Sequence, residues 1–289
     1  MKYRFMKEHH QSHSVEKMAR ILRISRSGYY KWLSRPYSRR KWENEELLEQ
    51  IRAIQERSRH RYGSPRVTKA LHRLGYQVGH NRVARLMRAN RLGRRLRKRF
   101  RSTTDSQHSL PVAKNLLNRE FEVAKANYSW VSDITYISTA EGWFYLCVVI
   151  DLYSRKVVGW AMSTRMKTDL VLEALRMAYL ARKPPEGVVF HSDRGSQYCS
   201  HAFRTRLRDY QMKQSMSRKG NCWDNAPAES FFKTLKCELN GHRAFRSREE
   251  AHRAIFEYIE VFYNRERLHS TLGYLTPVEY EKLMSRVAA

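Results

Sequence analysis

Three acidic residues, Asp133, Asp193 and Glu229, have the types and spacing that could hold divalent metal for chemistry on a phosphodiester. Asp193 and Glu229 are separated by 35 residues, and Asp133 lies upstream in a stretch of partly alternating apolar residues. Carboxylate oxygens are hard ligands that suit Mg²⁺ or Mn²⁺. Two such ions can activate an attacking oxygen and stabilise a leaving one. The acids therefore predict a two-metal site at which all three residues are both ligands and catalytic groups.

Each acid also has an ordinary structural alternative. Asp133 could be a solubilising residue at a strand edge, Asp193 a turn former, and Glu229 a first-turn acid favoured by the helix dipole. Asp151 is a competing acid after the second predicted strand, where we expect it to pair with Arg155 or to shape the turn. The order and flanking residues of the first three acids favour a joint site.

The elements that would position these acids form an α/β unit. Apolar and β-branched runs predict strands over 130–137, 144–150, 157–162, 188–191 and 211–217. Helices are predicted from Thr168 to the Pro184-Pro185 pair, over 200–210, from Pro227, over 248–264 and after Pro277. The order βββαβαβα is that of the RNase H-like fold, with a mixed five-stranded sheet and helices. Asp133 would then lie on a central strand, Asp193 at a strand end and Glu229 on a facing helix.

Helical patterns precede this unit. Over 14–34, two short helices with Ser25 as an N-cap predict either a helix-turn-helix or an ordinary helical hairpin. Helices over 44–57, from Pro65 to Gly75 and over 80–91 predict a second helix-turn-helix, with the last as its recognition helix. The predicted domains are a helix-turn-helix-like segment (1–40), a basic DNA-binding helix-turn-helix (41–101), a polar linker (102–118) and the catalytic core with C-terminal helices (119–286).

The net charge of +28 predicts a polyanionic partner. Residues 1–127 hold 32 basic and 10 acidic residues, which is +22 of that charge. From 51 to 101 there are 17 basic residues and a single acid, whereas a solvated helix face usually mixes signs. A basic surface of the ribosomal type is the alternative. The residues predicted to contact DNA are Arg82, Arg85, Arg88, Arg94, Arg95, Arg97, Lys98, Arg99, Lys233 and Lys236.

Two of these lysines, Lys233 and Lys236, lie four and seven positions after Glu229 and so share its helix face. They could meet DNA phosphates beside the metal, or they could be a solvated face. Four other polar residues are weaker candidates to line the cleft: His191, Gln197, Asn221 and Asn225. The segment 217–225 is polar and is expected to be mobile.

Several other classes of protein are disfavoured by the sequence. The four cysteines stand alone without a C-x-x-C pair, which suggests neither a zinc site nor a disulfide framework. No apolar run approaches the roughly 20 residues of a membrane span, and the first residues have no signal-peptide pattern. We therefore expect a cytoplasmic, nucleoid-associated protein.

Longer motifs carry a specific family resemblance over nearly the whole chain. They are Trp130-x-x-Asp133-Ile134-Thr135-Tyr136, His191-Ser192-Asp193-x-Gly195-x-Gln197-Tyr198, Asn225-Ala226-x-x-Glu229-Ser230-Phe231-Phe232-x-x-Leu235-Lys236 and Tyr263-Asn264-x-x-Arg267-x-His269. With the basic region before them, these motifs resemble bacterial insertion-sequence transposases, of the kind encoded by the second reading frame of an element. Such transposases have a DDE integrase core related to that of retroviral integrases.

The resemblance implies Mg²⁺-dependent 3′-end cleavage and strand transfer, often through a circular intermediate, and binding to the terminal inverted repeats. It implies double-stranded DNA of the element ends and target as partner, and a homo-oligomer on DNA. A partner protein from an upstream frame, or a frameshift fusion with it, is also implied, since no sustained heptad pattern is present. Two alternatives stay open: a non-catalytic DNA-binding regulator of the element, and a structure-specific RNase H-like nuclease.

Overall fold

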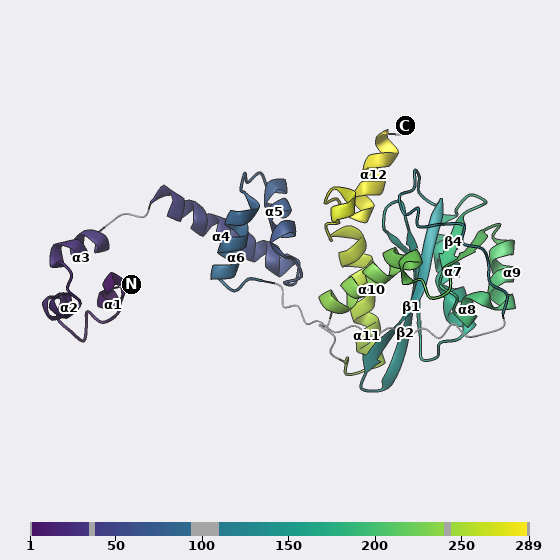
Figure 1. The fold of residues 1–289 in the computed structure, drawn as a ribbon, viewed down its shortest axis with the longest axis horizontal. Helices are drawn as coiled ribbons and strands as arrows, with labels where there is room; N and C mark the ends of the chain where they lie inside the picture. The colour runs from purple at the N-terminus through teal and green to yellow at the C-terminus, as the bar shows by residue number, and fades with distance from the viewer. Residues whose placement is uncertain (1, 35–37, 94–109, 240–243, 288–289) are drawn as a thin grey trace.

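The computed structural model describes residues 2–34, 38–93, 110–239 and 244–287, which form two helical clusters followed by an α/β unit (Figure 1). The first cluster contains α1 (Lys2–Glu8), α2 (Val15–Ile21) and α3 (Arg26–Leu33). The Ser25 hydroxyl accepts the backbone N–H of Gly28 at 3.0 Å, which confirms the predicted N-cap. The small core of this cluster consists of Met6, Met18, Ala19 and Tyr29.

The second cluster contains α4 (Arg39–Arg57), α5 (Ser64–Arg73) and α6 (His80–Ala89). Pro65 lies in the first turn of α5, where its missing N–H costs nothing, and Gly75 follows the helix with a φ of +90°. The helix α4 begins before the predicted residue 44. Its extra first turn is mostly charged and is exposed, Trp42 included, so the buried apolar stripe of the helix gave no sign of it.

The third unit is built on a five-stranded sheet of order β3-β2-β1-β4-β5. Its strands are β1 (Ser129–Thr139), β2 (Gly142–Asp151), β3 (Val157–Ser163), β4 (Val189–Ser192) and β5 (Lys213–Met216). The first three strands are antiparallel neighbours, whereas β4 pairs in parallel with both β1 and β5. The predicted mixed sheet and RNase H-like element order are thus confirmed.

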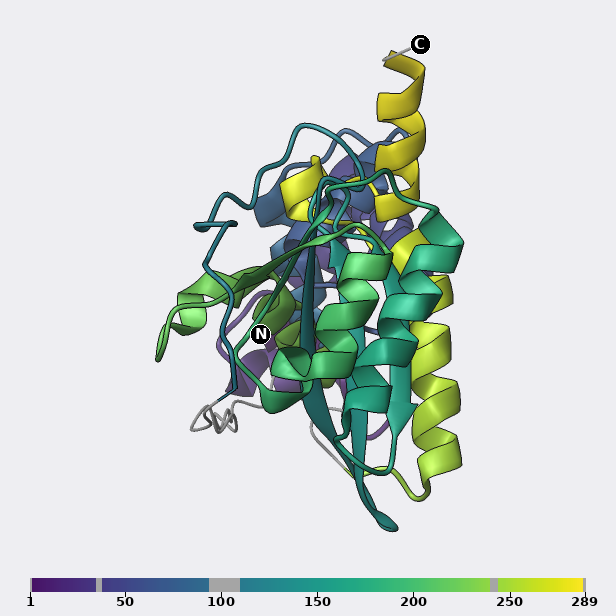
Figure 2. The same cartoon turned by 90° about the vertical axis from the view of Figure 1, so that its right-hand side faces the viewer.

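Side chains on successive residues of β2 point to opposite sides of the sheet, so apolar residues lie on both faces. Helices cover both of these faces. Cys147 and Val149 pack with α7 (Thr168–Arg182), α8 (Ser196–Cys199) and α9 (His201–Asp209). In Figure 2 these helices lie in front of the sheet, nearer to the viewer. The opposite face of β2 packs against three further elements, which are α10 (Ala226–Leu239), α11 (Arg248–Phe256) and the π-helical η2 (Glu257–Tyr263). The chain ends with η3 (Ser270–Leu272) and α12 (Pro277–Val287).

The predicted helix over 248–264 is confirmed, and its geometry changes from α to π after Phe256. Two other sequence predictions need correction here. The described part of the predicted linker, 110–118, packs on the core, because Leu117 is buried and the backbone N–H of Leu116 donates to the Ser215 hydroxyl at 2.8 Å. The segment 217–225, expected to be mobile, includes the short helix η1 (Cys222–Asn225) and is held by the buried Asp224.

Both outer strands of the sheet have partly covered edges. Beside β5, the N–H of Met216 donates to the carbonyl of Lys114 at 3.4 Å. At the start of β3, the side-chain amide of Asn264 pairs with Val157 as a neighbouring strand would, with both hydrogen bonds at 3.0 Å. No helix within the described ranges has the length and apolar character needed to cross a bilayer.

Candidate active site

Asp133, on β1, and Asp193, just after the end of β4, lie level with each other where two parallel strands run side by side. The β1–β4 register pairs Ser129 with Val189 and Val131 with His191, a constant offset of 60 positions. The same offset places Asp133 on β1 level with Asp193, one residue past the end of β4. Neighbouring strands are about 4.8 Å apart, so the two carboxylates lie close together in the middle of the sheet, at the point where β4 ends beside β1.

Local backbone contacts orient both carboxylates. Asp133 Oδ1 accepts the N–H of Ile134 at 2.8 Å, and Asp193 Oδ1 accepts the N–H of Gly195 at 3.0 Å. A Cβ at Gly195 would lie 3.0 Å from Gln197 Oε1 and 3.1 Å from Asp193 Oδ1. Glycine therefore allows the turn to close around the Asp193 carboxylate.

Glu229 lies in the first turn of α10, and one side chain holds the start of this helix against β1. Asn225 Nδ2 donates to the carbonyl of Ser132, the residue before Asp133, at 3.1 Å. The Asn225 side chain is buried, and its Oδ1 has no hydrogen-bond partner. Asn225 thus ties the strand of one acid to the helix of another.

Negative charge is concentrated where these elements meet. Burial, followed by the charges of Asp193 and Glu229, raises the pKa of Asp133 well above its ordinary value, against the opposing effects of the Ile134 N–H and Lys236. Burial also raises the pKa of Glu229. Burial lowers the pKa of Lys236, while the charge of Asp133 opposes that change. A cation placed among these carboxylates would relieve their repulsion, so the residues fit a divalent metal.

The three acids do not form a closed ligand cluster. Among the residues that the structure describes, no three His, Cys, Asp or Glu side chains are gathered closely enough to hold a metal ion. Asp133 and Asp193 are brought together by strand register, whereas Glu229 approaches from a separate helix. Lys236 lies within electrostatic reach of Asp133, and Lys233 is exposed on the same helix.

A buried polar group supports the strand beneath the two aspartates. The Tyr198 hydroxyl lies 2.8 Å from the Ser132 hydroxyl and 3.6 Å from Cys147 Sγ. Burial raises the pKa of the Cys147 thiol to about 12, so the thiol stays protonated at neutral pH. These residues connect α8, β1 and β2 and are structural.

Of the weaker cleft candidates, His191 is an internal residue of the sheet. Its ring nitrogens lie 2.8 Å from the Ser215 hydroxyl and 3.2 Å from the Ser217 hydroxyl. Burial lowers the pKa of His191 to about 4, so the ring is neutral at physiological pH. Gln197 donates to the carbonyl of Met166 at 2.9 Å and so anchors the Asp193 loop to the start of α7.

The competing acid Asp151 has a structural role. It accepts hydrogen bonds from the N–H groups of Asn127 at 2.9 Å and Tyr153 at 3.0 Å, and forms an ion pair with Arg182 at 3.2 Å. It shapes the turn as expected. The alternative role, a pair with Arg155, is not the one observed, because the Arg155 guanidinium donates to the carbonyl of Phe121.

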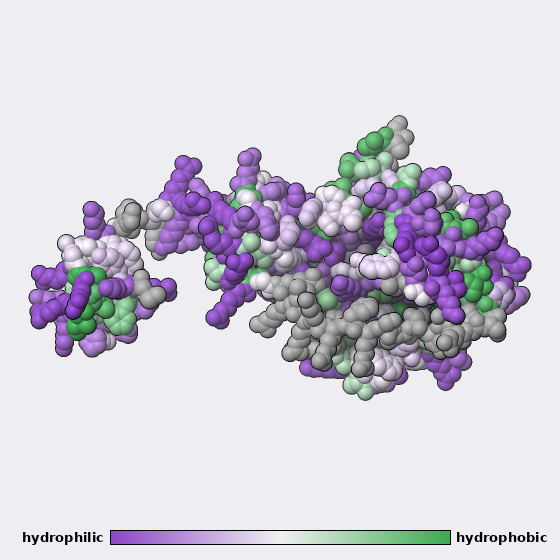
Figure 3. Space-filling model, viewed as in Figure 1, coloured by the Kyte–Doolittle hydropathy of each residue, from purple (hydrophilic) through white to green (hydrophobic). Residues whose placement is uncertain are grey.

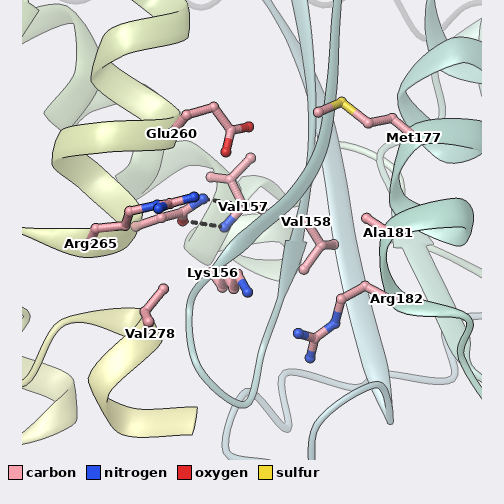
Figure 4. Close-up of a pocket in the computed structure, with 10 residues that line it drawn as sticks. Lys156, Val157, Val158, Met177, Ala181, Arg182, Glu260, Arg265 and Val278 are labelled. Carbon is pink, nitrogen blue, oxygen red and sulfur yellow. Dashed lines mark hydrogen bonds between the residues drawn. The ribbon is translucent and has the colours of Figure 1, made fainter. Parts of the chain in front are cut away.

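The motif that begins at Tyr263 also has a structural role. Asn264 pairs with the edge of β3, and Arg267 makes two hydrogen bonds to the buried Glu238 at 2.9 and 3.0 Å. His269 lies 3.3 Å from the carbonyl of Tyr263. A cavity of about 420 Å³ lies beside Asn264, between β3, α7 and η2 (Figure 4). The cavity lies at the β3 edge of the sheet, whereas β4 lies on the other side of β1. It is therefore separate from the acids.

Sequence reasoning missed Asp224, which fastens the segment before the core to the start of α10. This fully buried carboxylate accepts hydrogen bonds from Arg218, from Arg119 Nε at 2.8 Å and from Asn115 Nδ2 at 3.1 Å. The hydrogen bonds and charge of Arg218 hold the pKa of Asp224 well below its usual range. The available signal was its position as the single acid within 210–228.

The predicted DNA contacts on α6 separate into two groups. Arg85 and Arg88 are exposed, and Figure 3 shows mainly hydrophilic side chains over the visible face of α4–α6. Arg82, also predicted to contact DNA, is half-buried and donates to Asn44 Oδ1 at 2.8 Å and Glu43 Oε2 at 3.1 Å. The other basic residues predicted on this side lie outside the described residues: Arg94, Arg95, Arg97, Lys98 and Arg99.

Comparison with known proteins identifies the family. Residues 123–222 and 229–284 match Integrase core domain families, and residues 41–100 match an HTH-like domain family. The transposase InsF of insertion sequence IS3A from Escherichia coli K12 is 43% identical over 283 residues, which cover 97% of this chain and 98% of InsF. This chain belongs to the insertion-sequence transposases.

A second relative and two solved structures complete the comparison. The transposase is 45% identical over 272 residues to an uncharacterized 31 kDa protein of insertion element IS600 from Shigella sonnei, covering 94% of this chain and all of that protein. A simian T-cell lymphotropic virus intasome in complex with the PP2A regulatory subunit B56 gamma matches at 16% identity and a TM-score of 0.47, over 80% of this chain and 74% of that chain. The HTLV-2 integrase catalytic core domain in complex with magnesium matches at 16% identity and a TM-score of 0.42, over 54% and 96% of the two chains.

Proposed function

We propose that this transposase cleaves the ends of its element to leave a 3′-OH and joins that hydroxyl to target DNA, in a metal-dependent reaction. The observation that carries the proposal is the level placement of Asp133 on β1 and Asp193 just after β4, with the helix of Glu229 tied to β1 by Asn225. Burial and the neighbouring acids Asp193 and Glu229 raise the pKa of Asp133, and a cation bound among the three carboxylates would offset their repulsion.

The three acids have distinct roles in this proposal. Asp133 would hold both of two Mg²⁺ or Mn²⁺ ions, Asp193 one and Glu229 the other. When bound, such ions supply activation of the attacking oxygen and charge stabilisation at the leaving oxygen. Asn225 keeps the α10 helix against β1, and Gly195 lets the loop close around Asp193. Because Glu229 stands apart from the other two acids, we infer that its side chain completes the ligand set when metal and DNA bind.

DNA binding is assigned to the basic half of the chain. The exposed Arg85 and Arg88 on α6, the basic stretch 91–101 and the exposed Lys233 would neutralise phosphates at the terminal inverted repeats and beside the cleaved bond. Lys236, near Asp133, would contact the phosphate closest to the metal site. We propose that the active form on DNA is a homo-oligomer, joined by or fused to an upstream-frame protein.

A cleavage and joining assay tests the proposal. Labelled inverted-repeat ends are incubated with target DNA and Mg²⁺, with and without the upstream-frame protein. The wild type should yield nicked ends and joined products, whereas Asp133→Asn, Asp193→Asn and Glu229→Gln should yield neither and still bind the ends. Glu186→Gln, which changes an exposed acid away from the site, is the matched control. Cleavage without joining would indicate a nuclease, and binding without cleavage by the wild type would indicate a regulator.

A further inference from the structure

The second helical cluster docks on the catalytic unit through specific hydrogen bonds. The Tyr62 hydroxyl donates to the carbonyl of Glu266 and accepts the N–H of Leu268, both at 3.0 Å. Arg66 Nε donates to the carbonyl of Leu268 at 2.8 Å. Tyr62 precedes α5, and Arg66 lies in its first turn, so the docked side of this cluster differs from the exposed face of α6.

The other partner in this interface is the helix that bears Glu229. Near its C-terminal end, the buried Glu238 carboxylate accepts two hydrogen bonds from Arg267 and one from the Tyr258 hydroxyl at 2.9 Å. Arg66 Nη1 lies 3.8 Å from Glu238 Oε1, and Arg61 Nε donates to the Glu238 carbonyl at 3.1 Å. A buried carboxylate needs such partners, because an unpaired charge in this position is strongly destabilising.

Apolar packing continues across the interface. The Arg61 guanidinium lies over the Phe262 ring at 4.4 Å from its centroid, and the Tyr62 and Phe262 ring centroids are 6.3 Å apart. One continuous hydrophobic cluster contains Ile51 and Leu71 from the helical cluster as well as Leu235 from α10. Interfaces with a dry apolar centre and buried polar bonds hold their geometry better than wet, polar ones.

We propose that this docking sets the distance along DNA between the sequence that α6 binds and the phosphodiester that the acids cleave. Glu229 and Glu238 are nine residues apart on α10, which corresponds to about 13.5 Å along the helix axis at 1.5 Å per residue. This length is comparable to about four base-pair steps of DNA at about 3.4 Å each. Tyr62 and Arg66 are positioning residues that determine where the cut falls. This inference rests on the proposed function.

Substrates with inserted base pairs test the inference. The segment protected by the wild-type protein is mapped by footprinting, and one, two or five base pairs are inserted between that segment and the normal cut. The cut should move with the protected segment and remain at a constant distance from it. A cut that stays at the terminal nucleotides for every insertion would show that the active site reads the end by itself, and would overturn the inference.

Variants of the interface give a second test. Tyr62→Phe removes both bonds of the hydroxyl and keeps the ring, and Arg66→Met removes the guanidinium and keeps most of the aliphatic stem. The double variant should cut at several neighbouring positions, or at least tenfold more slowly, with end-binding affinity within twofold of wild type. Arg73→Gln is the matched control, because its pair with Glu279 is at the edge of the same interface and about 40% exposed.

The outcomes separate this inference from the proposed function. A wild-type protein that binds or cuts no element end contradicts the proposed function. A wild-type protein that cuts, together with a folded double variant that cuts at the same single position and rate, contradicts only the inference. Circular dichroism and thermal unfolding establish that the double variant is folded, and Tyr62→Phe alone replaces it if it is not.

Discussion

Asn225 donates its side-chain hydrogen bond to the backbone carbonyl of Ser132, immediately before Asp133, and thereby links the strand of Asp133 to the helix of Glu229, which are far apart in sequence. Asn225→Ala should slow cleavage by about 10- to 100-fold, because a displacement near 1 Å at an active site can cost that much. End binding should be unchanged. Single-turnover cleavage measures the effect, with Ser230→Ala, an exposed residue of the same helix, as control. An Asn225→Ala rate equal to wild type would contradict the positioning role.

Neutralising Asp133 should stabilise the metal-free protein. The carboxylate is half-buried beside Asp193 and near Glu229, so Asp133→Asn removes a repelled charge and keeps the shape. Thermal unfolding in EDTA at pH 7.5 should show a midpoint higher by roughly 2–4 °C, which is about 1 kcal/mol for a domain of this size. Mn²⁺ should then raise the midpoint of the wild type but not of the variant. An equal response of both proteins to Mn²⁺ would remove Asp133 from the ligand set.

Asp224 should contribute stability that depends on pH. Its folded pKa is depressed by Arg218, so the contribution is fully present above the unfolded pKa of about 3.9 and is lost as pH falls through the lower folded value. Asp224→Asn should cost roughly 1–3 kcal/mol at pH 7. Denaturant unfolding of both proteins between pH 7 and pH 3 measures the difference, which should shrink below about pH 4. A constant difference would contradict the ionic character of the contact.

Arginines on α6 should affect DNA binding in two different ways. Arg85→Gln and Arg88→Gln should each reduce the slope of log K against log salt concentration by about 1, since each removes one phosphate contact. Arg82→Gln should leave that slope unchanged and destabilise the α4–α6 cluster by about 1 kcal/mol, because it breaks the bonds to Asn44 and Glu43. Filter binding from 50 to 300 mM salt and urea unfolding measure the two effects. A reduced slope for Arg82→Gln would return that residue to the DNA contacts.

The strands of the core, and the order of its strands and helices along the chain, could be predicted because their sequence signals are local. Apolar, β-branched runs mark the strands, and Pro227 marks the start of the helix of Glu229. The pairing of Asp133 with Asp193 across parallel strands follows from that order, but the side-chain tie at Asn225 does not, because a hydrogen bond across 93 positions leaves no periodic pattern.

Side-chain partners were the least predictable part of the site. His191 and Arg267 occur in motifs that suggest chemistry, yet one bonds to serines inside the sheet and the other to Glu238. Arg82 has the helical position of an outward residue, and only the approach of α4 turns its guanidinium inward. Such roles depend on which helices and strands pack together. The periodicity of a single sequence does not give that information.

The covered edges of the sheet bear on how copies of the transposase behave at high concentration. An open strand edge is a template for aggregation, since its unpaired N–H and C=O groups can bind a strand of another molecule. Here Asn264 takes up the backbone groups of Val157 on β3, and the chain at Lys114 occupies part of β5. Asn264→Ala should therefore produce a protein that precipitates during refolding even where its catalytic acids are intact.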